Sequence, residues 1–267
     1  MKSYLSYFSI KYKTGLQYRL VALAGLSTQF FFGFIYILVY VAFYSSGDSN
    51  TPMALSELVS YIWLEQAFFA LIYMHYKDKD IVSMIKNGNV AYELTKPQDL
   101  YLMWGFKIYG ERLASLTLRL FPVLIFASLL PEPYKLHLSI SLVTFIPFII
   151  SIILASILIV AMLLLVHIIC IFTLDDKGIM NILLVIADLF SGLVLPIPFF
   201  PKIMQKVLTY LPFGYVSDFP FRLYIGNIPS NMAFKGITVQ IIWIVILVIV
   251  GRKLMKKALK NAVIQGG

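Results

Sequence analysis

Long apolar runs alternate with short polar segments along this chain, and the runs are long enough for helices that cross a membrane. The first run, residues 20–44, contains no charged residue. A helix rises about 1.5 Å per residue, so roughly 20 apolar residues cross a hydrocarbon core about 30 Å thick. The pattern therefore predicts an all-α membrane protein with six transmembrane helices, at residues 20–44, 55–76, 105–130, 138–174, 179–197 and 238–254.

The fourth run, residues 138–174, is too long for one straight crossing, because a single helix of that length would extend about 55 Å. Two crossings are possible, but they would move the basic tail to the side opposite the N-terminus. We therefore expect one long helix whose first part lies in or re-enters the outer leaflet, with its break at Pro147.

Two segments outside the predicted spans, residues 1–19 and 201–237, have mixed compositions. Residues 1–19 mix basic, aromatic and aliphatic side chains, which favours an interfacial helix on the inner membrane surface. Residues 201–237 interleave aromatic residues with prolines and glycines. Irregular backbone at membrane depth needs cover from protein or water, so this segment predicts an outer re-entrant hairpin between the fifth and sixth helices.

Residues 77–104 form the longest predicted loop on the inner side. Ile81, Met84 and Ile85 recur at helical spacing, and Gly88 can end the short amphipathic helix that this spacing predicts. Such a helix can pack on lipid headgroups alone, or it can be a docking element for a cytoplasmic partner.

Charge sets the expected orientation. The chain is 60% hydrophobic and 13% charged, with a net charge of +9. Fifteen of the 22 Lys and Arg residues fall on one side of the predicted membrane, in the N-terminal segment, the 77–107 region, the turn near residue 177 and the C-terminal tail. Basic residues collect on the cytoplasmic side, so both termini are expected there, and the excess charge indicates topology and not a nucleic-acid partner.

Several ionisable side chains fall within the predicted helices, namely Glu65, Arg112, Arg119, Asp188 and His167. Such groups are costly in a bilayer, and they raise the hypothesis of a function by default. They fit an ion or proton relay, or a structural pairing between a carboxylate and an arginine. A stand-alone secondary transporter or channel is therefore an alternative interpretation, although no internal repeat is visible.

Catalytic and metal-binding motifs are absent from the sequence. The phosphate loop G-x-x-x-x-G-K-[ST] does not occur, nor do H-E-x-x-H, G-x-S-x-G or a cluster of Cys and His. The single cysteine, Cys170, cannot form an intramolecular disulfide. We therefore predict no catalytic, cofactor-binding or metal-ligating residue on this chain.

Four stretches, in this order along nearly the whole chain, resemble the membrane subunits of type-2 ATP-binding-cassette (ABC) exporters. They are GNVAYELTKPQDLY (88–101), IFTLDDKGI (171–179), LPIPFFP with LPFGYVSDFPFRLYIG (195–226), and VIQGG (263–267). One departure is visible, since Phe172-Thr173-Leu174 stands where such proteins often carry an aromatic pair.

This resemblance implies a single permease domain, residues 1–267, in a bacterial cell membrane. Two such subunits, identical or paired with a sister permease, would sit among membrane lipids on two separate ATPase subunits. ATP and Mg would bind those ATPase subunits and not this chain. The substrate does not follow from the resemblance.

The resemblance also implies roles for particular residues. The segment 81–88 would be the coupling helix that docks on the ATPase, with an apolar docking face and a polar rim. The expected docking residues are Ile81, Met84, Ile85, Lys86, Gly88 and Glu93. The first and fifth helices would line the transport path.

Overall fold

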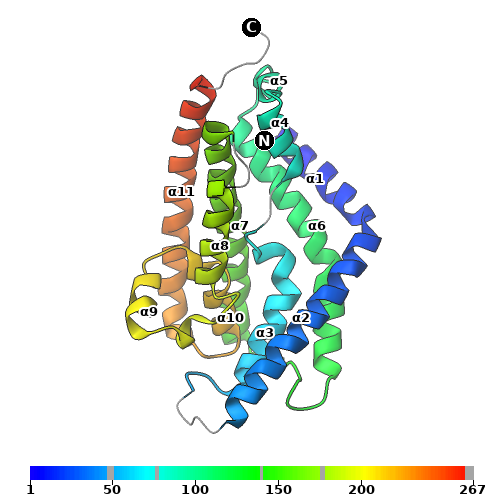
Figure 1. Ribbon diagram of the computed structural model, residues 1–267, viewed down its shortest axis with the longest axis vertical. Helices are drawn as coiled ribbons and strands as arrows, with labels where there is room; N and C mark the ends of the chain where they lie inside the picture. The colour runs from blue at the N-terminus through cyan, green and yellow to red at the C-terminus, as the bar shows by residue number, and fades with distance from the viewer. Residues whose placement is uncertain (47–50, 76–77, 139–140, 175–177, 262–267) are drawn as a thin grey trace.

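The computed structural model describes residues 1–46, 51–75, 78–138, 141–174 and 178–261, and these form helices, turns and loops (Figure 1). Five helices are long and apolar enough to cross a membrane: α2 (Arg19–Ser45), α3 (Leu55–Ile72), α6 (Leu100–Leu129), α7 (Leu142–Thr173) and α11 (Ala233–Asn261). A sixth apolar helix, α8 (Gly178–Ser191), has 14 residues and is about 21 Å long. The chain is an all-α membrane protein, as the sequence predicts.

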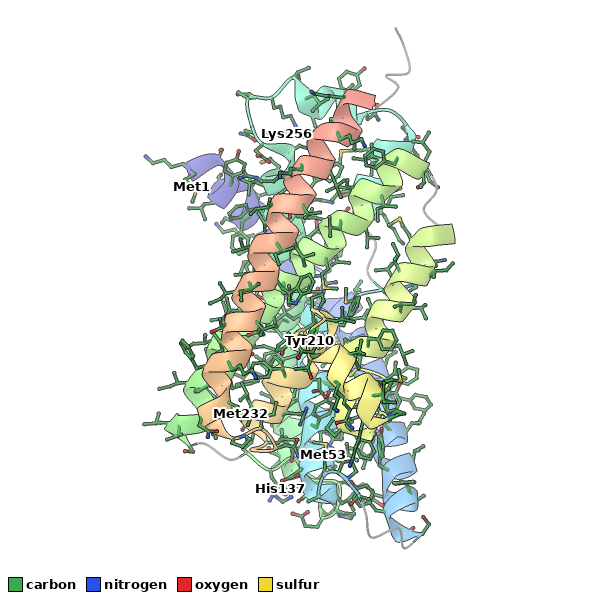
Figure 2. All side chains as sticks on the ribbon, turned by 90° about the vertical axis from the view of Figure 1, so that its left-hand side faces the viewer. Met1, Met53, His137, Tyr210, Met232 and Lys256 are labelled. Atoms are coloured by element: carbon green, nitrogen blue, oxygen red, sulfur yellow. The ribbon has the colours of Figure 1, made fainter. Side chains whose placement is uncertain are left out.

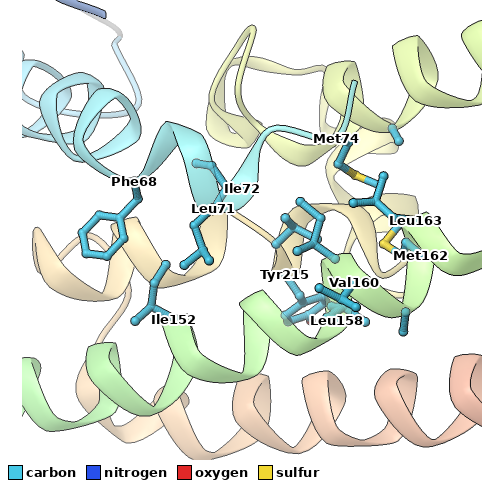
Figure 3. Close-up of a cluster of buried hydrophobic side chains, with 14 of the residues drawn as sticks. Phe68, Leu71, Ile72, Met74, Ile152, Leu158, Val160, Met162, Leu163 and Tyr215 are labelled. Carbon is cyan, nitrogen blue, oxygen red and sulfur yellow. The ribbon is translucent and has the colours of Figure 1, made fainter. Parts of the chain in front are cut away.

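Helix α7 occupies the centre of the bundle. It packs along α11 and also contacts α3, α6 and α8. Between α3 and α7 lies a cluster of buried side chains that includes Phe68, Leu71 and Ile152, with Tyr215 joining it from the segment after α8 (Figure 3). Because α7 is covered on most sides, 17 of its residues are buried, which explains its almost wholly apolar sequence.

The prediction of one long fourth helix is confirmed over the described residues. Helix α7 begins after Ser141, continues through Pro147 without interruption and ends at Leu174, whose φ of 50° closes it. Pro147 lies in the second turn, where only one backbone hydrogen bond is lost. The helix is therefore not broken at Pro147, where the break was expected.

Two predicted helices end earlier than expected. The second was expected to reach residue 76, but α3 ends at Ile72 and Tyr73 is extended. The fifth was expected to reach residue 197, but α8 ends at Ser191 because Gly192 takes a φ of +96° that continues no helix. At about 21 Å, α8 is shorter than a hydrocarbon core.

Two other helices are longer than expected. Helix α6 begins at Leu100 and not at residue 105, since the Asp99 carboxylate caps it by accepting a hydrogen bond from the Leu102 N–H at 3.1 Å. Helix α11 begins at Ala233 and continues through the basic tail to Asn261, because lysine and alanine favour helix as well as the apolar residues before them do.

The N-terminal segment forms the predicted helix, α1 (Lys2–Gln17), and this helix packs along the first half of α6. The Asp99 N–H donates to the Tyr4 hydroxyl at 2.9 Å, and the hydroxyls of Tyr12 and Thr117 lie 3.1 Å apart. These two contacts fix α1 parallel to α6. Its position on a membrane surface stays a prediction.

The segment between α8 and α11 contains only short helices: η1 (Ile197–Phe199), α9 (Lys202–Leu208), η2 (Phe213–Tyr215), α10 (Asp218–Tyr224) and η3 (Ser230–Met232). Helix α10 is almost wholly buried and packs on α7 and α3. The Gln240 amide of α11 holds η2 by donating to the Tyr215 carbonyl at 2.9 Å.

The two ends of the molecule differ in composition. Met1 and Lys256 lie toward one end, and Met53, His137 and Met232 lie toward the other (Figure 2). The end that holds the N-terminus also holds the basic part of α11. Predictions for Lys77, the turn 175–177 and the tail 263–267 lie outside the described residues.

Helix α10 should anchor the short-helix segment between α8 and α11 through Phe221. Its ring is fully buried, 5.8 Å from the ring of Tyr61 and 5.9 Å from that of Phe68. Phe221→Ala should remove about 3–5 kcal/mol of packing and lower the midpoint of thermal aggregation of the detergent-purified protein by roughly 5–10 °C. The control is Phe234→Ala, because the Phe234 ring is 80% exposed. An equal shift for both variants would contradict this packing.

Candidate functional site

The predicted amphipathic helix exists and stands at the end of the molecule near the N-terminus (Figure 1). It is α4 (Lys79–Lys86), followed by the short helix α5 (Val90–Leu94). The Asp78 carboxylate caps α4 by accepting from the N–H groups of Asp80 and Ile81, each at 3.0 Å. Gly88 has a φ of +69° just after α4, which confirms its predicted role in ending the helix.

The apolar face of α4 is directed into the chain itself, so the interpretation of Ile81 and Ile85 as exposed docking residues is wrong. Ile81 is 0% exposed and Ile85 is 4% exposed, packed in the same core as α7. Met84 is half-buried. The amphipathic pattern was real, but the partner of its apolar side is this bundle.

A different surface of the α4–α5 pair is exposed. We call it the α4–α5 surface; its exposed residues include Ser83, Lys86, Asn87, Asn89, Tyr92 and Leu94. Tyr92 is 72% exposed and Leu94 is 44% exposed. Glu93, expected at the rim, is half-buried and accepts from the Lys96 ammonium at 2.7 Å.

A buried lysine ties this surface to the membrane helices. Lys107 of α6 is 2% exposed, and its ammonium lies 2.5 Å from the Asp78 carboxylate and 2.9 Å from that of Asp80. It also lies 3.7 Å from Glu111, which is 3.7 Å from Lys11 of α1. Its hydrogen bond and charge hold the pKa of Asp80 below the usual range. We call these five residues the Lys107 hub.

His167 extends the hub to α7. Its Nδ1 lies 2.8 Å from the Leu163 carbonyl, and its Nε2 lies 3.3 Å from the Asp78 N–H. A carbonyl only accepts and an amide N–H only donates, so Nδ1 carries the proton and Nε2 is the acceptor. The neutral ring therefore positions the first residue before α4.

A second polar cluster holds the chain where α3 ends. The Arg112 guanidinium of α6 donates to the carbonyls of Leu71 and Tyr73, each at 2.6 Å. The Asp188 carboxylate of α8 accepts from the Met74 N–H at 2.9 Å. Arg112 thus satisfies carbonyls that the helix leaves open, and Asp188 satisfies the amide side of the same extended segment. We call this arrangement the α3-end clamp.

The predicted intramembrane network is only partly assembled. Arg112 and Asp188 meet at the α3-end clamp, whereas Glu65 and Arg119 lie elsewhere. Glu65 is 4% exposed in the middle of α3, one turn from Tyr61. The Tyr61 hydroxyl lies 3.3 Å from the Asp218 carboxylate, which accepts from the Ile197 N–H at 2.9 Å. This cluster, which we call the Asp218 cluster, joins α3 to the short-helix segment.

A groove of about 710 Å³ opens beside the α3-end clamp. Its walls are α2 and α8 and its floor is α3; the lining includes Thr28, Gln29, Tyr36, Gln66, Tyr73, His75, Asp188 and several aliphatic and phenyl side chains. Gln29 is 3% exposed, and neither atom of its amide has a hydrogen-bond partner in the described part of the chain. A buried amide without partners is costly, so this side chain marks a place where a polar group of a ligand would be stabilised.

The family assignment follows from a comparison with protein-family models. The model described as "ABC-2 family transporter protein" matches residues 29–266. The chain belongs to the ABC-2 transporter family. The match includes the α4–α5 surface, the Lys107 hub apart from Lys11, and all of the groove lining except Thr28. No curated protein matches the sequence. This ABC-2 permease is thus a membrane subunit of a family whose members generally work with a separate ATPase subunit.

Sequence reasoning missed the Lys107 hub and Gln29. A signal for the hub exists, because Lys107 and Glu111 are one turn apart while Asp78 and Asp80 flank a helix start. That pattern shows charges able to pair, but not that α4 folds back on α6. Nothing in the sequence around Gln29 indicates a site, because only the packing around its amide leaves it without hydrogen-bond partners.

The Lys107 hub should control the stability of α4. Lys107→Met leaves the Asp78 carboxylate buried without its cation, which costs about 3–5 kcal/mol when a buried pair is broken. The α4 amides of the purified permease should then exchange hydrogen more than tenfold faster, as measured by mass spectrometry. Lys79→Met, which removes an exposed charge from the same helix, should leave the exchange unchanged. Equal protection of α4 in both variants would show that the ion pair does not hold it.

Proposed function

We propose that this permease is the transmembrane subunit of an ABC exporter, which moves a substrate out of the cell with ATP hydrolysed on a separate subunit. The α4–α5 surface would seat the ATPase, and the groove between α2 and α8 would be this subunit's half of the transport path. A second permease, identical or a sister chain, would close the other half. ATP and Mg would belong to the ATPase.

Two sets of polar contacts, one at the α4–α5 surface and one beside the groove, carry this proposal, because α6 joins them. Lys107 binds the start of α4, and Arg112 follows it on α6 by five residues. Arg112 holds the end of α3, and Asp188 holds the next residues of the same segment from α8. A displacement of α4 would therefore reach the groove through groups with fixed geometry and not through flexible loops.

Charge supports an orientation with both termini in the cytoplasm of a bacterial cell. The end that holds Met1 also holds Lys256 and the α4–α5 surface (Figures 1 and 2). The positive-inside tendency assigns the more basic end to the cytoplasm. Helix α8 would then complete a sixth, short crossing together with the residues that follow it.

The short-helix segment supports an outer re-entrant hairpin. The Trp243 indole N–H donates to the Tyr210 carbonyl at 3.1 Å, and Trp243 lies ten residues, or about 15 Å, into α11. Tyr210 accordingly lies between the two ends of the molecule (Figure 2). The segment would thus enter the outer leaflet and return, closing the groove on that side.

A stand-alone secondary transporter is the second candidate, and Glu65 is the observation that favours it. Its carboxylate is buried in α3, and Oε1 has no hydrogen-bond partner in the described part of the chain. Arg112 and Asp188 do not support a relay, because both are engaged with backbone groups. Transport without an ATPase that is abolished by Glu65→Gln would favour this candidate over the exporter.

Tyr92 should be an anchor of the ATPase contact. Exposed tyrosines at the centre of interfaces commonly contribute about 2 kcal/mol, so Tyr92→Ala should weaken binding of the ATPase roughly thirtyfold. The affinity can be measured by titrating the purified ATPase against permease in nanodiscs. Tyr210→Ala is a matched control, because Tyr210 is 79% exposed but lies away from that end of the molecule (Figure 2). If both variants bind the ATPase as wild type does, the docking surface is elsewhere.

The orientation can be tested by labelling single cysteines in a Cys170→Ala background. Met232→Cys should react with an impermeant maleimide added outside intact cells, because Met232 is exposed toward the end opposite Met1, which we propose to face outward. Lys256→Cys should react only after the membrane is opened. The reverse pattern of labelling would invert the proposed topology.

A further inference from the structure

Arg119 lies in the long apolar helix α6, and no carboxylate of the described residues forms an ion pair with it. It lies in α6 against Gly25 of α2, and it is only partly exposed. Its Nε is buried without a hydrogen-bond partner in the described part of the chain. Because an isolated arginine is costly in a bilayer, this site calls for a counter-anion from outside the chain.

A pocket of about 180 Å³ adjoins this guanidinium. It lies between α3 and α6 and is lined by Arg119, Arg112, Ser115, Tyr73, Glu111 and two apolar residues of α3. The Glu111 carboxylate is already within 3.7 Å of both Lys11 and Lys107. Its charge is therefore compensated outside the pocket, and the two arginines leave the pocket net positive.

The depth of the pocket matches the headgroup region on the α1 side. Exposed apolar side chains of α2 begin at Leu20, directly after the exposed Arg19. Gly25 lies six residues beyond Arg19, or about 9 Å along the helix. On α6 the strongly exposed apolar residues begin at Phe121, two residues after Arg119. An arginine at this level can direct its guanidinium toward the lipid phosphates.

We propose that this pocket, between α3 and α6, binds the phosphate of an anionic phospholipid from the leaflet on the α1 side. The Arg119 guanidinium would donate to the phosphate oxygens, for which its planar fork is well suited. The Ser115 hydroxyl lies one turn away on the same helix and can donate to the same group. Basic pockets between membrane helices are a general means of holding such headgroups.

The site is distinct from the groove that we assign to transport. Phe69 and Tyr73 line both spaces, so their side chains separate the pocket from the groove. Their rings stack at 4.6 Å between centroids, which makes that partition rigid. A lipid bound in the pocket would stabilise the α3-end clamp from the side opposite the groove.

The test measures lipid retained by the permease alone, so it does not depend on an ATPase or on transport. Wild type, Arg119→Gln and Arg119→Lys would be purified in mild detergent with equal amounts of phosphatidylglycerol and phosphatidylcholine, and bound lipid counted by native mass spectrometry. We expect wild type to retain one phosphatidylglycerol tightly, Arg119→Gln to retain at least tenfold less, and Arg119→Lys to fall between them. The matched control is Arg19→Gln, which removes an exposed cation six residues from Gly25 and should retain lipid as wild type does.

Two further arms keep the result unambiguous. Gly25→Ala places a methyl group against the Arg119 guanidinium, and it should reduce retention without altering any charge. Inorganic phosphate at millimolar concentration should not displace the lipid; displacement would assign the pocket to a soluble anion and overturn the lipid source. Equal retention by wild type and Arg119→Gln, or equal loss in Arg19→Gln, would overturn the site.

Discussion

The buried ion pair between Lys107 and Asp78 is the constraint on which the rest of this permease depends. Both residues are 2% exposed, so water screens neither charge appreciably, and removing one partner would leave the other uncompensated. The ion pair fixes the position of α4 relative to α6. Through His167 it also involves α7, and through Glu111 and Lys11 it involves α1. A surface loop of eight-residue and five-residue helices would otherwise be held only by a few apolar contacts.

The same requirement for satisfied polar groups shapes the centre of the molecule. Where α3 ends at Ile72, its last carbonyls and the following N–H groups are deep inside the bundle, where water cannot reach them freely. Arg112 and Asp188 supply the missing hydrogen-bond partners from α6 and α8. The two ionisable residues therefore satisfy backbone groups. The groove beside them exists because the chain is extended there and not helical. The amide of Gln29, which lines this groove, is buried and has no hydrogen-bond partner in the described part of the chain.

Sequence reasoning recovered the elements whose cause is local. Apolar runs located the long helices, and Gly88 ended α4 with the positive φ that its role requires. The predictions from sequence were wrong where a contact between distant parts of the chain determines the structure. The spacing of Ile81 and Ile85 indicated that one side of α4 is buried, but spacing alone does not identify what covers that side. It is covered by the core of this chain. The end of α3 depends on Arg112, which lies 40 residues away in the sequence. The end of α8 could have been predicted from Gly192 after Ser191, but the apolar residues on both sides favoured a longer helix.

If Lys107 holds α4 as a rigid extension of α6, as the proposed function requires, force applied at the α4–α5 surface changes the groove between α2 and α8. Distances between paired spin labels in the assembled complex test this most directly. One pair would join Ser83 of α4 to Phe121 of α6, and the other would join Leu23 of α2 to Ile182 of α8; all four positions are exposed. Between the nucleotide-free and ATP-bound complex, the first distance should stay constant and the second should change. A first distance that shifts while the second stays fixed would contradict the account.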